Sequence, residues 1–245
     1  MSKTLKVLIT RPQEQASALA EKLNALGFKA DILGLTEIST IEAEISTPVA
    51  PLVIFVSANA VRQGLPQLRA AGVDLSACSL NAIGPATAGA LAAEGLISET
   101  PAAGFRSEEL LAHLGKELSE HKEASIICGV GGRGYLKDSL EKQGLKVNRI
   151  EVYKRHPAKA LKLEFEKYRS DNLPDIISLM NGEAVTTLND LIEDFKLLEW
   201  KAVPVVVSSS RIQKIAKDSG FLTVFCQTDP TESSLIDFLS QFSQR

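Results

Sequence analysis

The sequence predicts an α/β protein built from two units with parallel sheets, and two observations support this prediction. Short runs of aliphatic and β-branched residues alternate with helical patterns along all 245 residues. Continuous apolar strands of this kind are typical of parallel sheets that helices cover on both faces. The second half of the chain also repeats the plan of the first, with a period of about 120 residues, which indicates duplicated domain-sized units.

The repeat appears in three pairs of segments that share their apolar spacing; two pairs end on glycine and the third ends on Ala-Val. The paired segments are residues 23–27 and 140–144, 51–61 and 174–185, and 82–95 and 207–220. Two similar units in one chain imply a cleft between them, and such clefts are preferred sites for small molecules.

The elements follow in order from the N-terminus. Residues 7–10 form the first apolar strand, and Pro12 follows at a first-turn position. Leu19 and Leu23 belong to a helical pattern that Gly27 ends, and residues 30–35 return as a strand. Later strands are predicted at 52–56, 80–83, 126–128, 147–152, 176–180, 203–207 and 222–225. Later helices are predicted at 58–71, 86–93, 108–118, 133–143, 184–195, 212–218 and 232–242.

Composition excludes several classes of protein. The net charge of −3 offers no basic surface for nucleic acid or for an anionic membrane. No apolar run reaches the roughly 18 residues of a membrane span, and we expect no signal peptide. The three cysteines are few, odd in number and set in apolar segments, which favours a reducing cytoplasm. Neither they nor the three histidines have metal-ligand spacing, so no metal is predicted.

The loops that follow the predicted strands are rich in glycine and hydroxyl-bearing residues. Loops at the carboxyl ends of parallel strands build the binding site of such folds. Small residues there allow backbone N–H groups and helix N-termini to approach an anionic ligand. The alternative is that these Ser, Thr and Asn residues only cap the helices that follow them.

The segment ICGVGGRG at 127–134 contains G-x-G-x-x-G at Gly129, Gly131 and Gly134. It follows a strand and opens a helix, and Glu151 lies about 20 residues on, as in dinucleotide-binding folds. However, the motif lies in mid-chain, and the matching loop of the first repeat has no glycine. An anion-binding glycine turn is the preferred interpretation, and a dinucleotide-dependent enzyme remains an alternative.

No nucleophile–base pair can be recognised, because the sequence has no G-x-S-x-G motif and no histidine near a candidate nucleophile. His113, His121 and His156 are interpreted as surface residues. If the protein is an enzyme, its chemistry therefore needs little acid–base assistance from side chains.

The motifs VLITRP (7–12), FVSANAV (55–61), AIGPATA (82–88), CGVGGR (128–133), VYKR (152–155) and VVSSSR (206–211) together resemble uroporphyrinogen-III synthase over essentially the whole chain. The resemblance implies two flavodoxin-like lobes joined by a two-stranded connection. Lobe one would comprise residues 1–35 with 156–245 and lobe two residues 38–153, with linkers near 35–38 and 153–156.

The resemblance also implies a cofactor-free lyase of porphyrin biosynthesis. It would close hydroxymethylbilane into uroporphyrinogen III with inversion of the last ring, acting as a cytoplasmic monomer. The main task of the enzyme would be to hold the reacting carbons of the substrate in the correct geometry within the cleft. One modest acid would be enough to assist departure of the hydroxyl group. A third possibility is a two-lobed protein that binds a solute without reacting.

Tyr153 matches the family's cleft tyrosine and is the candidate acid that assists departure of the hydroxyl; packing at a strand end is its alternative role. The expected substrate-binding residues lie in the loops after the strands: Arg11, Ser57, Asn59, Gly84, Thr87, Gly129, Gly131, Gly132, Arg133, Asn181, Ser209 and Ser210. The sequence departs from the family pattern in three segments. Cys128 stands in place of Arg, Met180-Asn181 in place of Thr-Ser, and Ser208–Arg211 in place of a loop of the G-x-T-T-A type. The individual carboxylate contacts therefore stay open.

Overall fold

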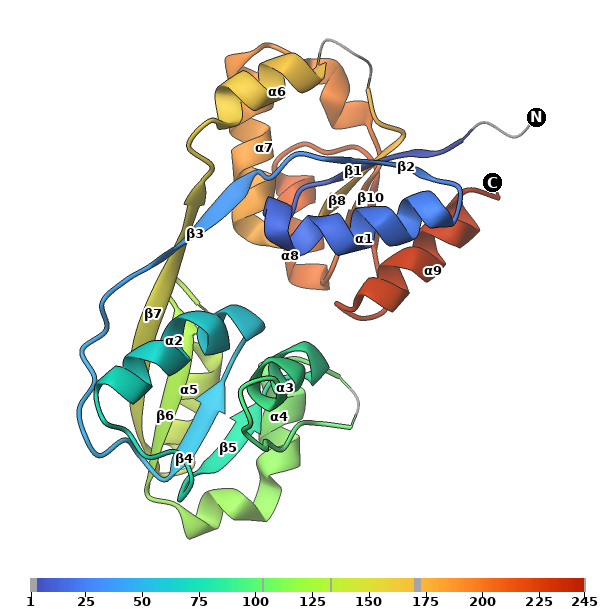
Figure 1. Ribbon diagram of the computed structural model, residues 1–245. Coiled ribbons are helices and arrows are strands. Elements are labelled where there is room, and N and C mark those ends of the chain that lie inside the picture. Colours follow the sequence, from blue (N-terminus) through green and yellow to red (C-terminus); the bar gives the residue numbers. More distant parts are fainter. Residues whose placement is uncertain (1–3, 103, 133, 170–172, 245) are drawn as a thin grey trace. The chain divides into compact units, whose positions relative to one another are not determined.

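The chain forms two compact units, each with its own mostly parallel sheet (Figure 1). The computed structural model describes residues 4–102, 104–132, 134–169 and 173–244. Unit 1 consists of the residues up to Ile38 and from His156 onwards, and unit 2 of Ser39–Arg155. The predicted fold class is confirmed as α/β with two mostly parallel sheets. Among the described residues, no helix combines the length and hydropathy needed to cross a bilayer.

The sheet of unit 1 has the strand order β10-β9-β8-β1-β2, and each adjacent pair is parallel. Its strands are β1 (Lys6–Ile9), β2 (Lys29–Ile32), β8 (Ile176–Leu179), β9 (Val205–Val207) and β10 (Val224–Cys226). The N-terminal strand β1 thus lies between its sequence neighbour β2 and the distant β8. Counted along the chain within this unit, the order is 2-1-3-4-5, the order of flavodoxin-like folds.

Both faces of this sheet are buried. On one face, Val7 and Ile9 pack with α1 (Gln13–Ala25) and α9 (Glu232–Phe242). On the other, Leu8 packs with α6 (Leu161–Arg169), α7 (Gly182–Asp194), α8 (Ser210–Asp218) and the 3-10 helix η2 (Leu198–Ala202). Successive residues of β1 point to opposite faces, and a strand buried on both faces must therefore be apolar throughout.

The sheet of unit 2 has the order β3-β7-β6-β4-β5. Its strands are β3 (Thr36–Thr40), β4 (Leu52–Phe55), β5 (Ser79–Ala82), β6 (Glu123–Gly129) and β7 (Lys146–Pro157). The helices α4 (Ser107–Leu114) and α5 (Tyr135–Lys142) pack on Leu52 and Ile54, and the 3-10 helix η1 (Gly115–Glu120) follows α4. The remaining helices are α2 (Ala58–Ala70) and α3 (Pro85–Ala92). A Cβ at Gly64 of α2 would lie 2.7 Å from Ile127 Cγ2, so this helix packs tightly on the opposite face.

Several predicted boundaries were wrong. The strand β3 and the helix α6 were not predicted, because β3 reads TEIST with little apolar content and α6 buries only Leu161 and Phe165. The helix predicted at 108–118 ends at Leu114, where Gly115 has φ +43° and a 3-10 turn follows. The strands β6 and β7 are longer than predicted because polar residues extend both. Cys226 is exposed and Cys78 half-buried, whereas Cys128 is buried.

Candidate functional site

The order of the strands indicates where each unit would bind a ligand. In open α/β sheets, ligands bind beyond the carboxyl ends of the strands at the point where the strand order reverses. That point lies between β4 and β6 in unit 2 and between β1 and β8 in unit 1. In unit 2, Ser57 follows β4 and Gly129 is the last residue of β6. In unit 1, Arg11 follows β1 and Asn181 follows β8.

Tyr153 and Ser57, two residues singled out in the sequence, lie together in unit 2. The Tyr153 hydroxyl is 3.1 Å from Ser57 Oγ, although 96 residues separate them in the chain. Arg155 donates from Nη2 to Tyr153 Oη at 3.3 Å, and its guanidinium carbon lies 5.2 Å from the ring centroid. The ring itself is buried, with 3% of Tyr153 exposed. Arg155 was not predicted as a site residue, although the VYKR motif contains it.

Tyr153, Ser57 and Arg155 form a hydroxyl cluster. Within it, one hydroxyl proton is not used in a hydrogen bond between its members. Ser57 caps α2, and its Oγ accepts from the Ala60 N–H at 3.0 Å. A guanidinium can only donate, so Arg155 uses one lone pair of Tyr153 Oη. Ser57 and Tyr153 then share one hydrogen bond, in either direction, and the hydroxyl that accepts this bond keeps its own proton. The cluster can therefore donate one O–H to a bound molecule.

Gly129 provides the space for the Tyr153 ring. A Cβ at Gly129 would lie 2.6 Å from two ring carbons of Tyr153, a distance that side chains do not tolerate. The β6–β7 register shifts between Cys128 and Gly129, which brings Gly129 opposite Tyr153, and the Val130 N–H donates to Tyr153 O at 2.9 Å. Gly131 has φ +76°, a conformation that favours glycine.

Replacing Gly129 with Ala is therefore expected to destabilise the protein by about 1–3 kcal/mol, the usual cost of overpacking. The added methyl group has no space unless the Tyr153 ring moves. Gly132→Ala is the matched control, since its nearest atoms lie 3.6 Å away in ordinary contact. Chemical denaturation of both variants measures the difference. Equal midpoints for Gly129→Ala and the wild type would show that the ring relocates freely.

Two further expected residues, Gly84 and Thr87, lie in the loop after β5 and at the start of α3. Gly84 is the N-cap of α3, and a Cβ there would lie 3.0 Å from the Phe105 side chain. Thr87 is buried, and its hydroxyl has no hydrogen-bond partner in the described part of the chain. In the first turn of α2, Asn59 Oδ1 accepts from Arg62 Nη1 at 3.5 Å.

In unit 1, the expected polar residues first serve their own helices. Asn181 Oδ1 accepts from the Ala184 N–H at 2.8 Å as the N-cap of α7. Ser209 Oγ accepts from the Ile212 N–H at 3.4 Å as the N-cap of α8, and Ser210 is the first residue of that helix. Asn181 and Ser209 therefore both cap the helices that follow them. The Asn181 amide and the Ser209 hydroxyl keep donors that capping does not use.

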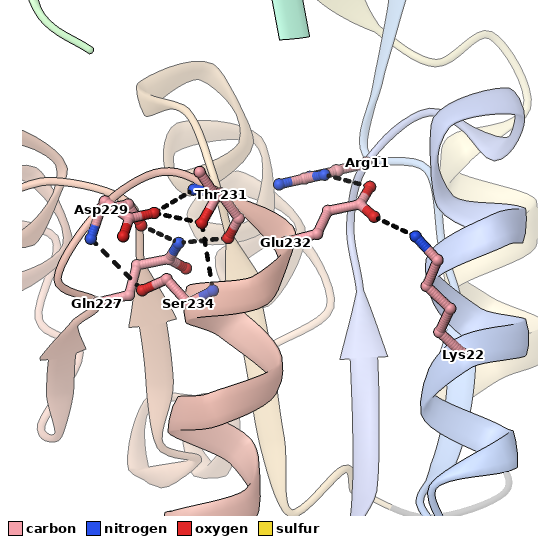
Figure 2. A network of polar contacts seen from close by, with 7 residues as sticks. All are labelled: Arg11, Lys22, Gln227, Asp229, Thr231, Glu232 and Ser234. Carbon is pink, nitrogen blue, oxygen red and sulfur yellow. Dashed lines mark hydrogen bonds and ion pairs between the residues drawn. The ribbon is translucent and has the colours of Figure 1, made fainter. Parts of the chain in front are cut away.

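Arg11 lies in an ion-pair network at the N-terminus of α9 (Figure 2). Its Nη1 is 3.4 Å from Glu232 Oε1, and Lys22 Nζ is 3.2 Å from the other carboxylate oxygen. Burial lowers the pKa of the Arg11 guanidinium, and Glu232 opposes this shift. Because two cations share one carboxylate, the triad retains one net positive charge.

A hydrogen-bonded turn holds this carboxylate in place. The Thr231 N–H donates to Asp229 Oδ1 at 2.8 Å, and Thr231 Oγ1 accepts from the Ser234 N–H at 3.2 Å, which caps α9 (Figure 2). Gln227 donates from Nε2 to Thr231 O at 3.1 Å. These bonds fix the first turn of α9, and with it the backbone of Glu232.

The dinucleotide alternative loses support in this structure. Glu151, which would bind a ribose hydroxyl, forms an ion pair with Arg149 at 2.9 Å. Arg133, an expected substrate-binding residue within the glycine motif, lies outside the described residues. Cys128 is buried in the core of unit 2, and this burial raises the pKa of its thiol. Within the described ranges, no group of three or more His, Cys, Asp or Glu residues is placed to hold a metal ion.

Comparison with known proteins gives a consistent result. The family model described as "Uroporphyrinogen-III synthase HemD" matches residues 17–237. A crystal structure of a mutant uroporphyrinogen III synthase from the extremely thermophilic bacterium Thermus thermophilus is similar, with a TM-score of 0.60 and 19% identity, covering 99% of this chain and 100% of that one. The uroporphyrinogen-III synthetase structure from Helicobacter pylori has a TM-score of 0.62 and 16% identity, covering 98% and 100%. At these identities the structures support the fold.

Proposed function

The chain belongs to the uroporphyrinogen-III synthase family and is a cyclising lyase of tetrapyrrole biosynthesis, and from this premise we propose that Tyr153 assists the reaction as a proton donor. The substrate that the family implies is hydroxymethylbilane, a linear tetrapyrrole with many carboxylates. We further propose that the protein acts as a cytoplasmic monomer without a cofactor.

The reaction makes modest demands on acid–base chemistry. When the hydroxymethyl group is protonated, its oxygen leaves as water and an electrophilic azafulvenium cation remains. The electron-rich pyrrole carbons attack this group readily, and unassisted closure at the unsubstituted carbon gives the type I isomer. The enzyme must instead direct attack to the substituted carbon through a spiro intermediate. Holding the reacting carbons in the correct geometry is therefore the main catalytic task.

The observation that carries the proposal is the hydroxyl cluster of Tyr153, Ser57 and Arg155. When Ser57 donates to Tyr153 Oη, the phenol proton remains available for the departing hydroxyl. The guanidinium beside Oη stabilises the negative charge that develops there as the proton leaves.

The other strand-end residues are proposed to bind carboxylates. In unit 2, backbone N–H groups at Gly84, Gly129, Gly131 and Gly132, together with the side chains of Asn59 and Thr87, supply donors. In unit 1, Asn181, Ser209 and Ser210 supply donors, and Arg11 supplies charge that Glu232 partly compensates. The retained donors of these caps and the net positive charge around Arg11 suit an anionic substrate.

Incubation with hydroxymethylbilane tests the function. After oxidation and chromatographic separation of the isomers, we expect uroporphyrin III in excess over a control without protein, with no cofactor added. A product that is entirely type I, as in the control, would rule out the assignment. Binding of the substrate without conversion would instead indicate a non-catalytic binding protein.

A further inference from the structure

Arg155 and Tyr153 lie on the same side of β7. Successive side chains of a strand point to opposite faces, so residues two apart are neighbours. The guanidinium carbon of Arg155 lies 5.2 Å from the Tyr153 ring centroid, and Nη2 donates to Oη at 3.3 Å. Lys154, between them, points the other way and is exposed. Arg155 therefore makes two contacts with one tyrosine, one to its ring and one to its oxygen.

The charge of Arg155 is not used by an acidic residue. Four other arginines have carboxylate partners in the described residues: Arg149 pairs with Glu151, Arg69 with Glu94, Arg11 with Glu232 and Arg169 with Glu166. In the described part of the chain, Arg155 has no carboxylate partner, and its polar contact is the phenol oxygen. Hydrogen bonds from charged donors are stronger than those from neutral ones.

Arg155 also limits how Tyr153 can be arranged. The ring packs against Gly129, where the space is too small for a Cβ, and the hydroxyl meets Ser57 on the neighbouring loop. The Arg155 guanidinium donates a hydrogen bond to one lone pair of Tyr153 Oη. Rotations of the hydroxyl that would break this hydrogen bond are therefore disfavoured. The same hydrogen bond also polarises the O–H bond and strengthens it as a donor.

We propose that Arg155 is a positioning residue for the cyclisation, which holds the Tyr153 hydroxyl in place and supplies the charge that stabilises its oxygen. This inference rests on the proposed role of Tyr153 as the proton donor. Arg155 acts through Tyr153 and does not itself contact the substrate. Its contribution to turnover must therefore disappear when the hydroxyl is absent.

A double-mutant cycle tests this directly. We expect Arg155→Gln to lower kcat by roughly 10- to 100-fold, as for the loss of one charged hydrogen bond, while KM changes less than about twofold. In the Tyr153→Phe background, the same substitution should change kcat by less than about twofold. Arg155→Lys keeps a charged donor and should recover part of the lost rate.

Lys154→Gln is the matched control, because it removes the same charge one residue away without a contact to Tyr153; we expect the wild-type rate. An equal loss from Arg155→Gln in both backgrounds, or a rise in KM alone, would overturn the inference and indicate direct substrate binding. A wild-type rate for Tyr153→Phe would overturn the proposed role of Tyr153 as well, so the two failures are distinguishable. Circular dichroism of each variant verifies the fold.

Discussion

Replacement of Tyr153 by Phe is expected to lower kcat by about 10- to 1000-fold while the product remains uroporphyrinogen III. The substitution removes the hydroxyl that contacts Ser57 and Arg155 and keeps the buried ring in its place. Because geometry selects the attacking carbon, loss of the acid slows departure of the hydroxyl group without changing the choice of carbon. Initial rates with hydroxymethylbilane, followed by isomer analysis, measure both quantities.

Tyr135→Phe is the control for this experiment, since it removes the same atom from a tyrosine that is exposed on α5. We expect it to have the wild-type rate. If Tyr153→Phe also has the wild-type rate, Tyr153 is a packing residue, as its alternative interpretation holds. If the variant keeps its fold and has no activity, acid catalysis has a larger share of the reaction than we propose.

Replacement of Phe165 by Ala is expected to lower the free energy of unfolding of unit 1 by about 3–5 kcal/mol, the usual cost of deleting a buried aromatic side chain. Phe165 on α6 is fully buried, and its ring lies 5.0 Å from that of Trp200 and 5.6 Å from that of Phe195. Its removal leaves a cavity in the core that these rings cannot fill without moving.

Trp200 is the only tryptophan in the sequence, so its fluorescence reports the unfolding of unit 1 in denaturant. Leu163→Ala on the same helix is the control, because Leu163 is 56% exposed and should change stability by less than about 0.5 kcal/mol. Similar midpoints for the two variants would contradict the packing described for α6.

Elements with a clear apolar periodicity and a capping residue are predictable from local sequence patterns, and elements with few buried residues are not. The helix predicted at 232–242 has those bounds in the structure, because an apolar stripe and the Thr231 cap specify it together. The helix α6 has only two buried residues in its polar sequence, so periodicity does not reveal it. The strand β7 continues well beyond the predicted end at 152, and for that reason Arg155 was not recognised as a neighbour of Tyr153.

The candidate site shows the same division. The sequence indicated Tyr153, Ser57 and Gly129 separately, each from a strand-end motif. Their meeting depends on the adjacent pairing of β4, β6 and β7, and on a register shift at Gly129. A shift of one residue turns a side chain to the other face of a sheet, and no local pattern specifies it.

The sequence by itself determined the class of the fold, the duplication, most of the strands and helices, and the family. These features depend on short-range periodicity and on motifs that are contiguous in the chain. Only the tertiary structure decided that β1 pairs with β8, where Val7 lies opposite Ile176, and that Arg155 lies against Tyr153. An apolar strand such as β1 can pair equally well with many others, because its buried faces carry little information about the partner. The choice is made by the packing of whole layers, in which each strand and helix completes the burial of the others.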